Sequence, residues 1–233
     1  MKESPFLRRA IKPQRPAKNP LGRDEIVRAA LRIVKTEGID GVSMRRIAAE
    51  FETGPSSLYA HVTSKDELLQ LMFDEVCGMV EIPPLDPPRW KEQILEIARA
   101  SHRILLDHYD LARAALAIVP TGPNALRASD AMIGMMLAGG VPAQHAAWAM
   151  DRIFLYVTAD AYEMSIWRGT ATEEEAFPAE LERDLRAYFE QVPVDLYPNI
   201  RAHAQELVSG DAEARFEFGL ALLVDGLGKY VTK

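Results

Sequence analysis

Side chains that can contact DNA gather in the stretch SMRRIAAEFETGPSSLYAHVTSKDELL, from Ser43 to Leu69. Two short helical patterns lie on either side of the break ETGP in this stretch. Two helices joined by a tight, glycine-containing turn form a helix-turn-helix, whose second helix enters the major groove. The second pattern, PSSLYAHV, would be about 12 Å long, close to the width of that groove. The spacing therefore predicts a DNA-reading helix at residues 55–62.

Small and polar side chains occupy the outward face of this predicted helix, while Leu58 and Val62 are expected to face the preceding helix. The outward face carries Pro55, Ser56, Ser57, Tyr59, Ala60 and His61, followed by Lys65. Hydroxyl and ammonium groups bind phosphate oxygens, and a small apolar side chain can meet a thymine methyl group. A purely structural interpretation stays open, in which the tyrosine and the histidine only cover the core between two short helices.

The charges are divided unevenly along the chain, whose net charge is −7. Residues 1–65 hold 13 basic and seven acidic side chains, and residues 66–233 hold 14 basic and 27 acidic ones. A basic first part on an acidic body is expected when one domain alone contacts phosphate. A solvated basic tail would explain residues 1–23 almost as well.

Helical periodicity dominates the chain, with no clear strand or hairpin signal, so we expect an all-α fold. After a basic, mobile tail at 1–23, four helices are expected in the first 80 residues. The last of them starts at Ser64, which has the capping-box spacing to Glu67. The proline-rich segment EIPPLDPPRW connects to further helices at about 90–107, 110–117, 124–139, 142–168, 178–191 and 212–231.

Several classes of protein find no support in the residues. No nucleophile motif, phosphate-binding loop or zinc spacing is evident, so we expect no enzyme, no cofactor and no metal. The single cysteine, Cys77, fits a reducing cytoplasm. No apolar run of about 18 residues could span a membrane, and the first residues lack the apolar core of a secretion signal.

The last predicted helix, FEFGLALLVDGLGKYV, is apolar on much of its circumference. Leu220, Leu223 and Leu227 recur at helical spacing, which predicts a homodimer through this helix. Its glycines lower helix propensity, and close packing against another helix would justify them. The alternative is a helix buried in the core of a monomer.

The series GIDGVSMRRIAAEFETGPSSLYAHVTSKDELL resembles the DNA-binding domain of TetR-family transcriptional regulators. The resemblance covers residues 24–80, and it implies DNA contacts from Ser43, Arg45, Ser56, Ser57, Tyr59, Ala60, His61 and Lys65. The tetracycline repressor has a tryptophan where this chain has Ala60, so we expect a different operator sequence.

Trp90 and the segments LLDHYDLARAAL, YVTADAYE and FEFGLALLVDGL are similar to the effector domain of the tetracycline-repressor branch. The resemblance implies a three-helix DNA-binding domain at 24–70 and a ligand-binding, dimerising domain at 71–233. Candidate ligand contacts are His102, Met132, Met136, Phe154, Thr158, Tyr162, Glu163 and Trp167. Ala115 takes the place of a histidine that helps hold a magnesium–drug complex in the tetracycline repressor, which speaks against a metal-chelated tetracycline.

The expected function is therefore a ligand-responsive repressor that binds double-stranded operator DNA as a homodimer and is released by a small molecule. Two alternatives remain: a helical homodimer that binds small molecules without binding DNA, and a helical enzyme. A salt-dependent DNA titration would separate the first alternative from the repressor.

Overall fold

The structure, a computed structural model, describes residues 21–167 and 179–231. The regular elements within these ranges are all helices, which confirms the predicted all-α class. Across the same ranges, no helix has the length and apolar content that crossing a bilayer requires. The predicted tail at 1–23, except for its last three residues, and the acidic segment 168–178 lie outside the described residues.

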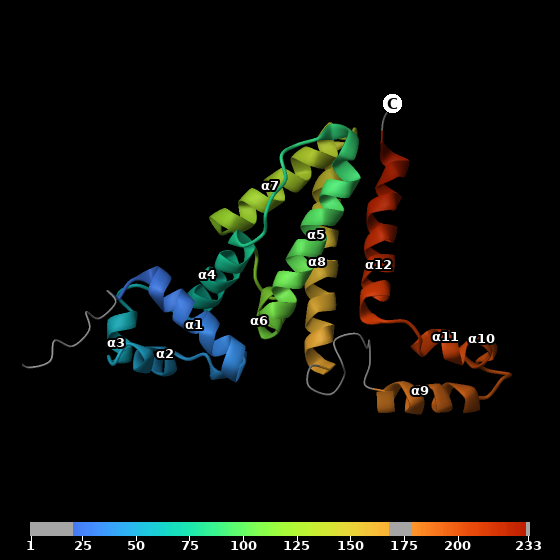
Figure 1. Cartoon of the computed structure of the whole chain (residues 1–233), viewed down its shortest axis with the longest axis horizontal. Helices are drawn as coiled ribbons and strands as arrows, with labels where there is room; N and C mark the ends of the chain where they lie inside the picture. The colour runs from blue at the N-terminus through green and yellow to red at the C-terminus, as the bar shows by residue number, and fades with distance from the viewer. Residues whose placement is uncertain (1–20, 168–178, 232–233) are drawn as a thin grey trace, which may run out of the picture.

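A small group of helices forms one end of the molecule (Figure 1). It consists of α1 (Arg23–Glu37), the 3₁₀ helix η2 (Ile39–Gly41), α2 (Met44–Glu50), α3 (Pro55–Leu58) and α4 (Lys65–Gly78). Their apolar faces meet in a core that includes Ile26, Ile33, Ile47 and Leu58, all 2 % exposed or less. Burial of these side chains holds η2, α2 and α3 against α1 and α4, because helices as short as these three are unstable alone.

Serine side chains cap the N-termini of α2 and α4, and the cap of α4 forms at Ser64, where the sequence predicts it. The Ser43 hydroxyl accepts a hydrogen bond from Arg46 N at 3.1 Å, and the Ser64 hydroxyl accepts one from Glu67 N at 3.0 Å. The Glu67 carboxylate reaches one residue further back than a capping box requires and accepts from Thr63 N at 2.6 Å. The start of α4 is therefore held directly behind residues 53–62, the reading turn, which comprise α3 and the turns on either side of it.

The reading helix is shorter than predicted. The α-helical part, α3, ends at Leu58, and residues 59–61 continue as a turn. His61 N donates to Leu58 O at 2.8 Å, which is a 3₁₀-type bond, and Val62 N donates to the same oxygen at 3.0 Å. Tightening of the last turn is a common way for a helix to end, so the side chains keep their helical order.

The larger part of the molecule is built around α5, α8 and α12, which run side by side (Figure 1). Its elements are η3 (Pro87–Arg89), α5 (Trp90–Asp107), α6 (Tyr109–Ala115), α7 (Pro123–Ala138), α8 (Ala143–Trp167), α12 (Ala212–Gly226) and η4 (Leu227–Tyr230). The bounds of α5 to α8 agree with the predicted ranges within about two residues, which is the usual uncertainty of helix ends.

Three further helices lie to the side of this body, beyond the foot of α12 (Figure 1). Of these, α9 (Ala179–Gln191) follows the prediction, whereas α10 (Pro198–Ala202) and α11 (Ala204–Val208) fall in a segment for which no helix is predicted. Five residues are too few to show a helical period, which explains the omission. The three helices pack on one another.

The last helix corrects the predicted dimer face. As an α-helix it ends at Gly226, and Leu220 and Leu227 are buried within their own chain. Gly219 lies against Tyr156 of α8, whose hydroxyl donates to Phe216 O at 2.9 Å. Close packing therefore does explain this glycine, but the packing partner is a helix of the same chain.

Candidate DNA-reading surface and ligand cavity

The helices α2 and α3 lie at the end of the molecule that is remote from α12 (Figure 1). Of the predicted DNA contacts, those with exposed side chains are Ser43, Arg45, Pro55, Ser56, Ser57, Tyr59, Ala60 and Lys65, while His61 is half-buried. Leu58 and Val62 are fully buried, and Tyr59 is 51 % exposed. These burials confirm that Leu58 and Val62 face inward, and they leave about half of the Tyr59 side chain open to solvent.

The two neighbouring arginines of α2 differ in their freedom to contact a ligand. The Arg46 guanidinium is 2.7 Å from Glu37 and forms a second ion pair with Glu50 on α2 itself. Its hydrogen bond to Glu37, followed by that to Glu50, raises the pKa of Arg46. Arg45 is exposed, and no ion pair of its side chain is found in the described part of the chain.

Two residues that contact the reading turn were not predicted from the sequence. Arg23, at the start of α1, donates from Nε to His61 O at 3.2 Å and lies 3.5 Å from Glu67. Thr53, in the turn itself, donates from Oγ1 to Ser57 Oγ at 2.9 Å. The Arg23 contact joins segments 38 residues apart, so no local pattern could reveal it.

A cavity of about 310 Å³ lies between α4, α5, α6, α7 and α8. The helix that follows the reading turn, α4, contributes Phe73, Val76, Cys77 and the adjoining Val80. The rings of Phe73 and Phe154 meet edge to face with their centroids 5.8 Å apart. Polar groups are few, and they come from Ser101, Ser129 and Asp151. Such a mainly apolar hollow with a few polar groups is the usual form of a small-molecule site.

The lone cysteine lines this cavity but is not a nucleophile at neutral pH. Burial, with a smaller contribution from Asp74, raises the pKa of Cys77 to about 12. The thiol therefore stays protonated and acts as a small apolar group in the cavity wall.

Two of the predicted ligand contacts, Met132 and Phe154, line the cavity. Five do not: Met136 and Thr158 are fully buried elsewhere, His102 contacts other residues, and Tyr162 and Glu163 lie further along α8. The side chain of Trp167, the last residue of α8, lies outside the described residues.

His102 is occupied by contacts within the helical body. Its Nε2 lies 2.7 Å from Asp160 Oδ2, and its ring stacks on Phe216 with centroids 3.8 Å apart. These contacts join α5, α8 and α12. Ala115, by contrast, does line the cavity, so an apolar wall stands where the family resemblance puts a metal-binding histidine.

Several lining residues were not predicted, among them Phe73, Ser101, Ile104, Leu116, Ser129 and Met150. The sequence does hold a signal for two of them. Ser101 lies between Ile97 and Leu105, each four residues away, and Ser129 lies four residues after Ala125. A serine within an apolar helical stripe marks a position where a polar group is tolerated inside the fold.

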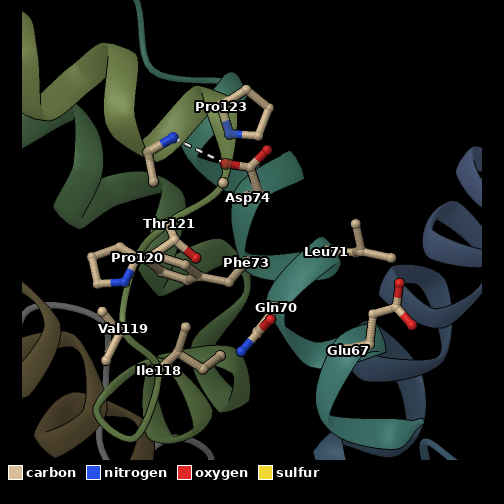
Figure 2. Close-up of a pocket in the computed structure, with 12 residues that line it drawn as sticks. Glu67, Gln70, Leu71, Phe73, Asp74, Ile118, Val119, Pro120, Thr121 and Pro123 are labelled. Atoms are coloured by element: carbon tan, nitrogen blue, oxygen red, sulfur yellow. Dashed lines mark hydrogen bonds between the residues drawn. The ribbon is translucent and has the colours of Figure 1, made fainter. Parts of the chain in front are cut away.

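A smaller crevice of about 190 Å³ lies between α4 and the segment that joins α6 to α7 (Figure 2). Phe73, Ile118, Val119 and Pro120 line both this crevice and the cavity. At its far end, Asp74 accepts hydrogen bonds from Asn124 N and Ala125 N, both at 3.0 Å. Asp74 thereby caps α7 and attaches α4 to the helical body.

A second attachment joins the first group of helices to α6. Asp110 Oδ2 accepts from Ile39 N at 2.7 Å, and Arg113 lies 2.8 Å from Asp40. Gly38 makes this approach possible, because its φ of 73° favours glycine and a Cβ there would meet Asp110 Oδ2 at 2.5 Å. The other end of α6 lines the cavity with Ala115, as does Leu116, the residue that follows the helix.

The chain matches two family models. Residues 26–72 match the model of bacterial regulatory proteins of the tetR family, and residues 83–231 match that of tetracyclin repressor-like C-terminal domains. An HTH-type transcriptional regulator of Saccharopolyspora erythraea is 32% identical over 207 residues, which are 89% of this chain and 84% of that protein. The HTH-type transcriptional repressor DrrR1 of Streptomyces coeruleorubidus is 30% identical, over 93% of this chain and 80% of that protein.

Solved structures agree with these relatives. ActR of Streptomyces coelicolor, a TetR family protein determined in complex with actinorhodin, is 39% identical to this chain and superimposes with a TM-score of 0.84. The similarity covers 92% of this chain and 100% of that one. With both family models matched and whole-length relatives at this identity, the chain belongs to the TetR family of ligand-responsive transcriptional regulators.

Proposed function

We propose that the chain is a homodimeric repressor whose two reading turns bind the two halves of one operator, and that a small molecule in the cavity of about 310 Å³ releases it. A dimer binds tightly only while the spacing of its reading elements matches the spacing of the half-sites. A ligand that binds more tightly to a dimer with a different spacing lowers the affinity for the operator. The size of this loss is set by the ligand's difference in binding free energy between the two states.

The observation that carries this proposal is the course of α4. The helix begins at Lys65, directly after the reading turn, and four residues of α4 and its C-terminal continuation line the cavity. A ligand that contacts Phe73 or Val76 therefore touches the same rigid element that supports the reading turn. A change of a few ångströms at the cavity would be carried to the DNA-facing end along a single helix.

We assign the DNA contacts to the exposed residues of the reading turn and its flanks: Ser43, Arg45, Pro55, Ser56, Ser57, Tyr59, Ala60, His61 and Lys65. Tyr59, Arg45 and Lys65 suit phosphate oxygens, and the serines and the alanine suit base edges. The reading domain would comprise residues 24–70, with α4 continuing across the boundary into a ligand-binding and dimerising domain of residues 71–233.

The ligand that fits the cavity is predominantly apolar and carries hydroxyl or carbonyl groups. Ser101 and Ser129 can pair with such groups, and Met132, Phe73 and Phe154 offer apolar and aromatic contact. Actinorhodin, which ActR binds, is a reasonable first probe because of the likeness between the two chains. We assign the chain no catalytic step, because its relatives are regulators, and we place its action in the cytoplasm, where DNA is accessible.

The test is selection of genomic fragments by the purified protein, followed by displacement. We expect enrichment of a two-fold symmetric sequence, and we expect a ligand identified from the neighbouring genes to release the protein from it. Ala128→Trp, which fills the cavity, should abolish the response to that ligand. The proposal fails if no sequence is enriched, or if the Trp variant responds to the ligand like the wild type.

A further inference from the structure

Two neighbouring stripes of α4 line two different spaces. Glu67, Gln70 and Asp74 recur at intervals of three and four residues, so they share one face of the helix, and they line the crevice of about 190 Å³. The stripe beside it is apolar and lines the cavity of about 310 Å³ with Phe73, Val76, Cys77 and the adjoining Val80. One helix therefore gives the crevice a polar wall and the cavity an apolar wall.

The crevice and the cavity adjoin each other. Phe73, Ala125 and the segment 118–120 line both of them. Figure 2 shows Gln70 pointing from α4 toward Ile118 on the opposite side of the crevice. Gln70 is exposed, and no hydrogen bond of its side chain is found among the described residues. A molecule whose body fills the cavity can therefore extend past Phe73 into the crevice and meet an amide that is open to a partner.

The charged side chains that line the two spaces are all carboxylates. Among the described residues they are Glu67 and Asp74 in the crevice and Asp151 in the cavity, and the lining includes no lysine, arginine or histidine. A carboxylate or phosphate group on a ligand would lose its water here without gaining an oppositely charged partner. These walls therefore disfavour an anionic ligand.

Asp74 is the carboxylate whose charge is least compensated. Glu67 lies 3.5 Å from the Arg23 guanidinium, and Asp151 lies 2.6 Å from that of its neighbour Arg152. Asp74 instead accepts three hydrogen bonds from neutral N–H groups in the first turn of α7. A helix N-terminus supplies only part of a positive charge, so a net negative charge remains at the half-buried Asp74.

The charge of Asp74 also acts on the cavity wall. After the larger effect of burial, Asp74 contributes to the raised pKa of Cys77, which lines the cavity. Asp74 therefore lies where a positively charged group is favoured on the crevice side, next to the apolar space that would hold the body of the ligand.

We propose that the crevice is a second compartment of the ligand site and that it takes an amine, carried on a short chain by an apolar body in the cavity. An ammonium group has three N–H donors, which suit the Asp74 carboxylate and the Gln70 side-chain carbonyl. The inference rests on the proposed function, in which the cavity is the effector site, and adds the chemical class of the effector.

The test is the binding of three fluorescent probes to the full-length protein. Each carries a dansyl group, which suits the apolar cavity and becomes brighter on leaving water, on a chain of five methylene groups that ends in an ammonium, a methyl or a carboxylate group. The ammonium probe, dansylcadaverine, should bind several-fold more tightly than the methyl probe, and the carboxylate probe should bind most weakly. An ammonium probe that does not bind, or that binds no better than the methyl probe, overturns the inference.

Variants locate the group that selects the amine. Asp74→Asn keeps an oxygen that can accept from α7 but removes the charge, so the ammonium probe should lose its advantage. Thr121→Trp fills the crevice without lining the cavity and should have the same effect. The matched control is Glu75→Gln, an exposed neighbour on α4 that lines neither space and should leave the ratio of affinities unchanged. Equal losses in Asp74→Asn and Glu75→Gln would mean that the amine responds to overall charge, and the inference fails.

Ala128→Trp separates this inference from the proposed function beneath it. Ala128 lines the cavity but not the crevice, so this variant should lose all three probes. If it does, and the ammonium group confers no advantage on the wild type, the cavity stands as the ligand site and only the inference is overturned. If it binds all three probes like the wild type, the cavity is not their site, and the ligand site of the proposed function fails as well. Melting temperatures close to that of the wild type show that the variants are folded.

Discussion

Tyr59 directly follows α3 and Lys65 is the first residue of α4, and both side chains are exposed. Neither is needed to bury Leu58 or Val62, so their removal should spare the fold. Tyr59→Phe and Lys65→Ala should weaken binding to all operator variants alike, and Lys65→Ala should lower the slope of log affinity against log salt by about one. Titrations of labelled operators at several salt concentrations check this.

The matched control for the lysine is Lys229→Ala. Lys229 lies on η4, at the end of the chain remote from α3 (Figure 1). Its removal should leave the salt slope unchanged. Equal slopes for the Lys65 and Lys229 variants would mean that another surface contacts the phosphates.

An ion pair between α5 and α12 provides a pH prediction at the scale of single residues. Arg99 Nε and Nη2 donate to the two Glu217 carboxylate oxygens, both at 2.7 Å. These bonds, ahead of the opposing effect of burial, hold the pKa of Glu217 below its ordinary value. The contribution to stability is therefore present above the unfolded pKa, about 4.3, and is lost as the pH falls through the lower folded pKa.

Glu217→Gln should remove this acid-sensitive contribution. Because both side chains are at least a third exposed, the contribution is at most about 1 kcal/mol. Urea unfolding at pH 7 and pH 3 measures it: the wild type should lose more stability between the two than the variant does. Identical losses would show that solvent screens the pair completely.

Among the elements, α6 joins the cavity to the reading domain. One end of the helix lines the cavity, and Asp110 at the other end accepts from Ile39 N at 2.7 Å. Asp110→Ala leaves this backbone group unpaired in a partly buried place, which costs about 1–3 kcal/mol. We expect a lower melting temperature together with weaker operator binding, because the reading domain is held in place less firmly.

The control is Asp130→Ala on α7, an exposed carboxylate, which should change neither quantity. Calorimetry and operator titration on both variants test the prediction. If Asp110→Ala destabilises the protein but binds the operator like the wild type, this attachment is structural only.

At the scale of the whole molecule, apolar side chains left exposed by one chain indicate where the second chain packs. On α12, Phe218 is 68% exposed and Leu222 is 60% exposed, and α8 exposes Trp148 in the same way. Large exposed apolar side chains of this kind mark interfaces. The dimer typical of the family would therefore bury Phe218 and Leu222 rather than Leu220 and Leu227.

Replacing Phe218 and Leu222 by Glu should give a folded monomer that binds the operator poorly, since one reading turn contacts only one half-site. Analytical ultracentrifugation at micromolar concentration measures the assembly. Leu126→Glu on α7, also at an exposed leucine, should remain dimeric. A double variant that sediments as a dimer would place the interface elsewhere.

Local interactions explain what the sequence determined by itself. The caps at Ser43 and Ser64, the break before Pro55 and the opposite faces of Leu58 and Tyr59 depend on residues within four positions of one another. Such short-range patterns can be recognised in the amino-acid sequence without a structure. The reading turn, most helix bounds and the family resemblance were predictable for this reason.

Tertiary structure decided the features that depend on which helices pack against one another: the exposed face of α12, the cavity walls and the partners of His102. The periodicity of the sequence identified α12 as apolar on much of its circumference. It could not divide the leucines of α12 between the chain's own core and the exposed side, because periodicity does not identify the element against which a helix face packs. The cavity walls come from five helices spread from Phe73 to Leu155, so no local pattern groups them. His102 was predicted to contact the ligand, but it pairs with Asp160 and stacks on Phe216 instead. These partners lie 58 and 114 positions further along the chain, beyond the range of any local pattern.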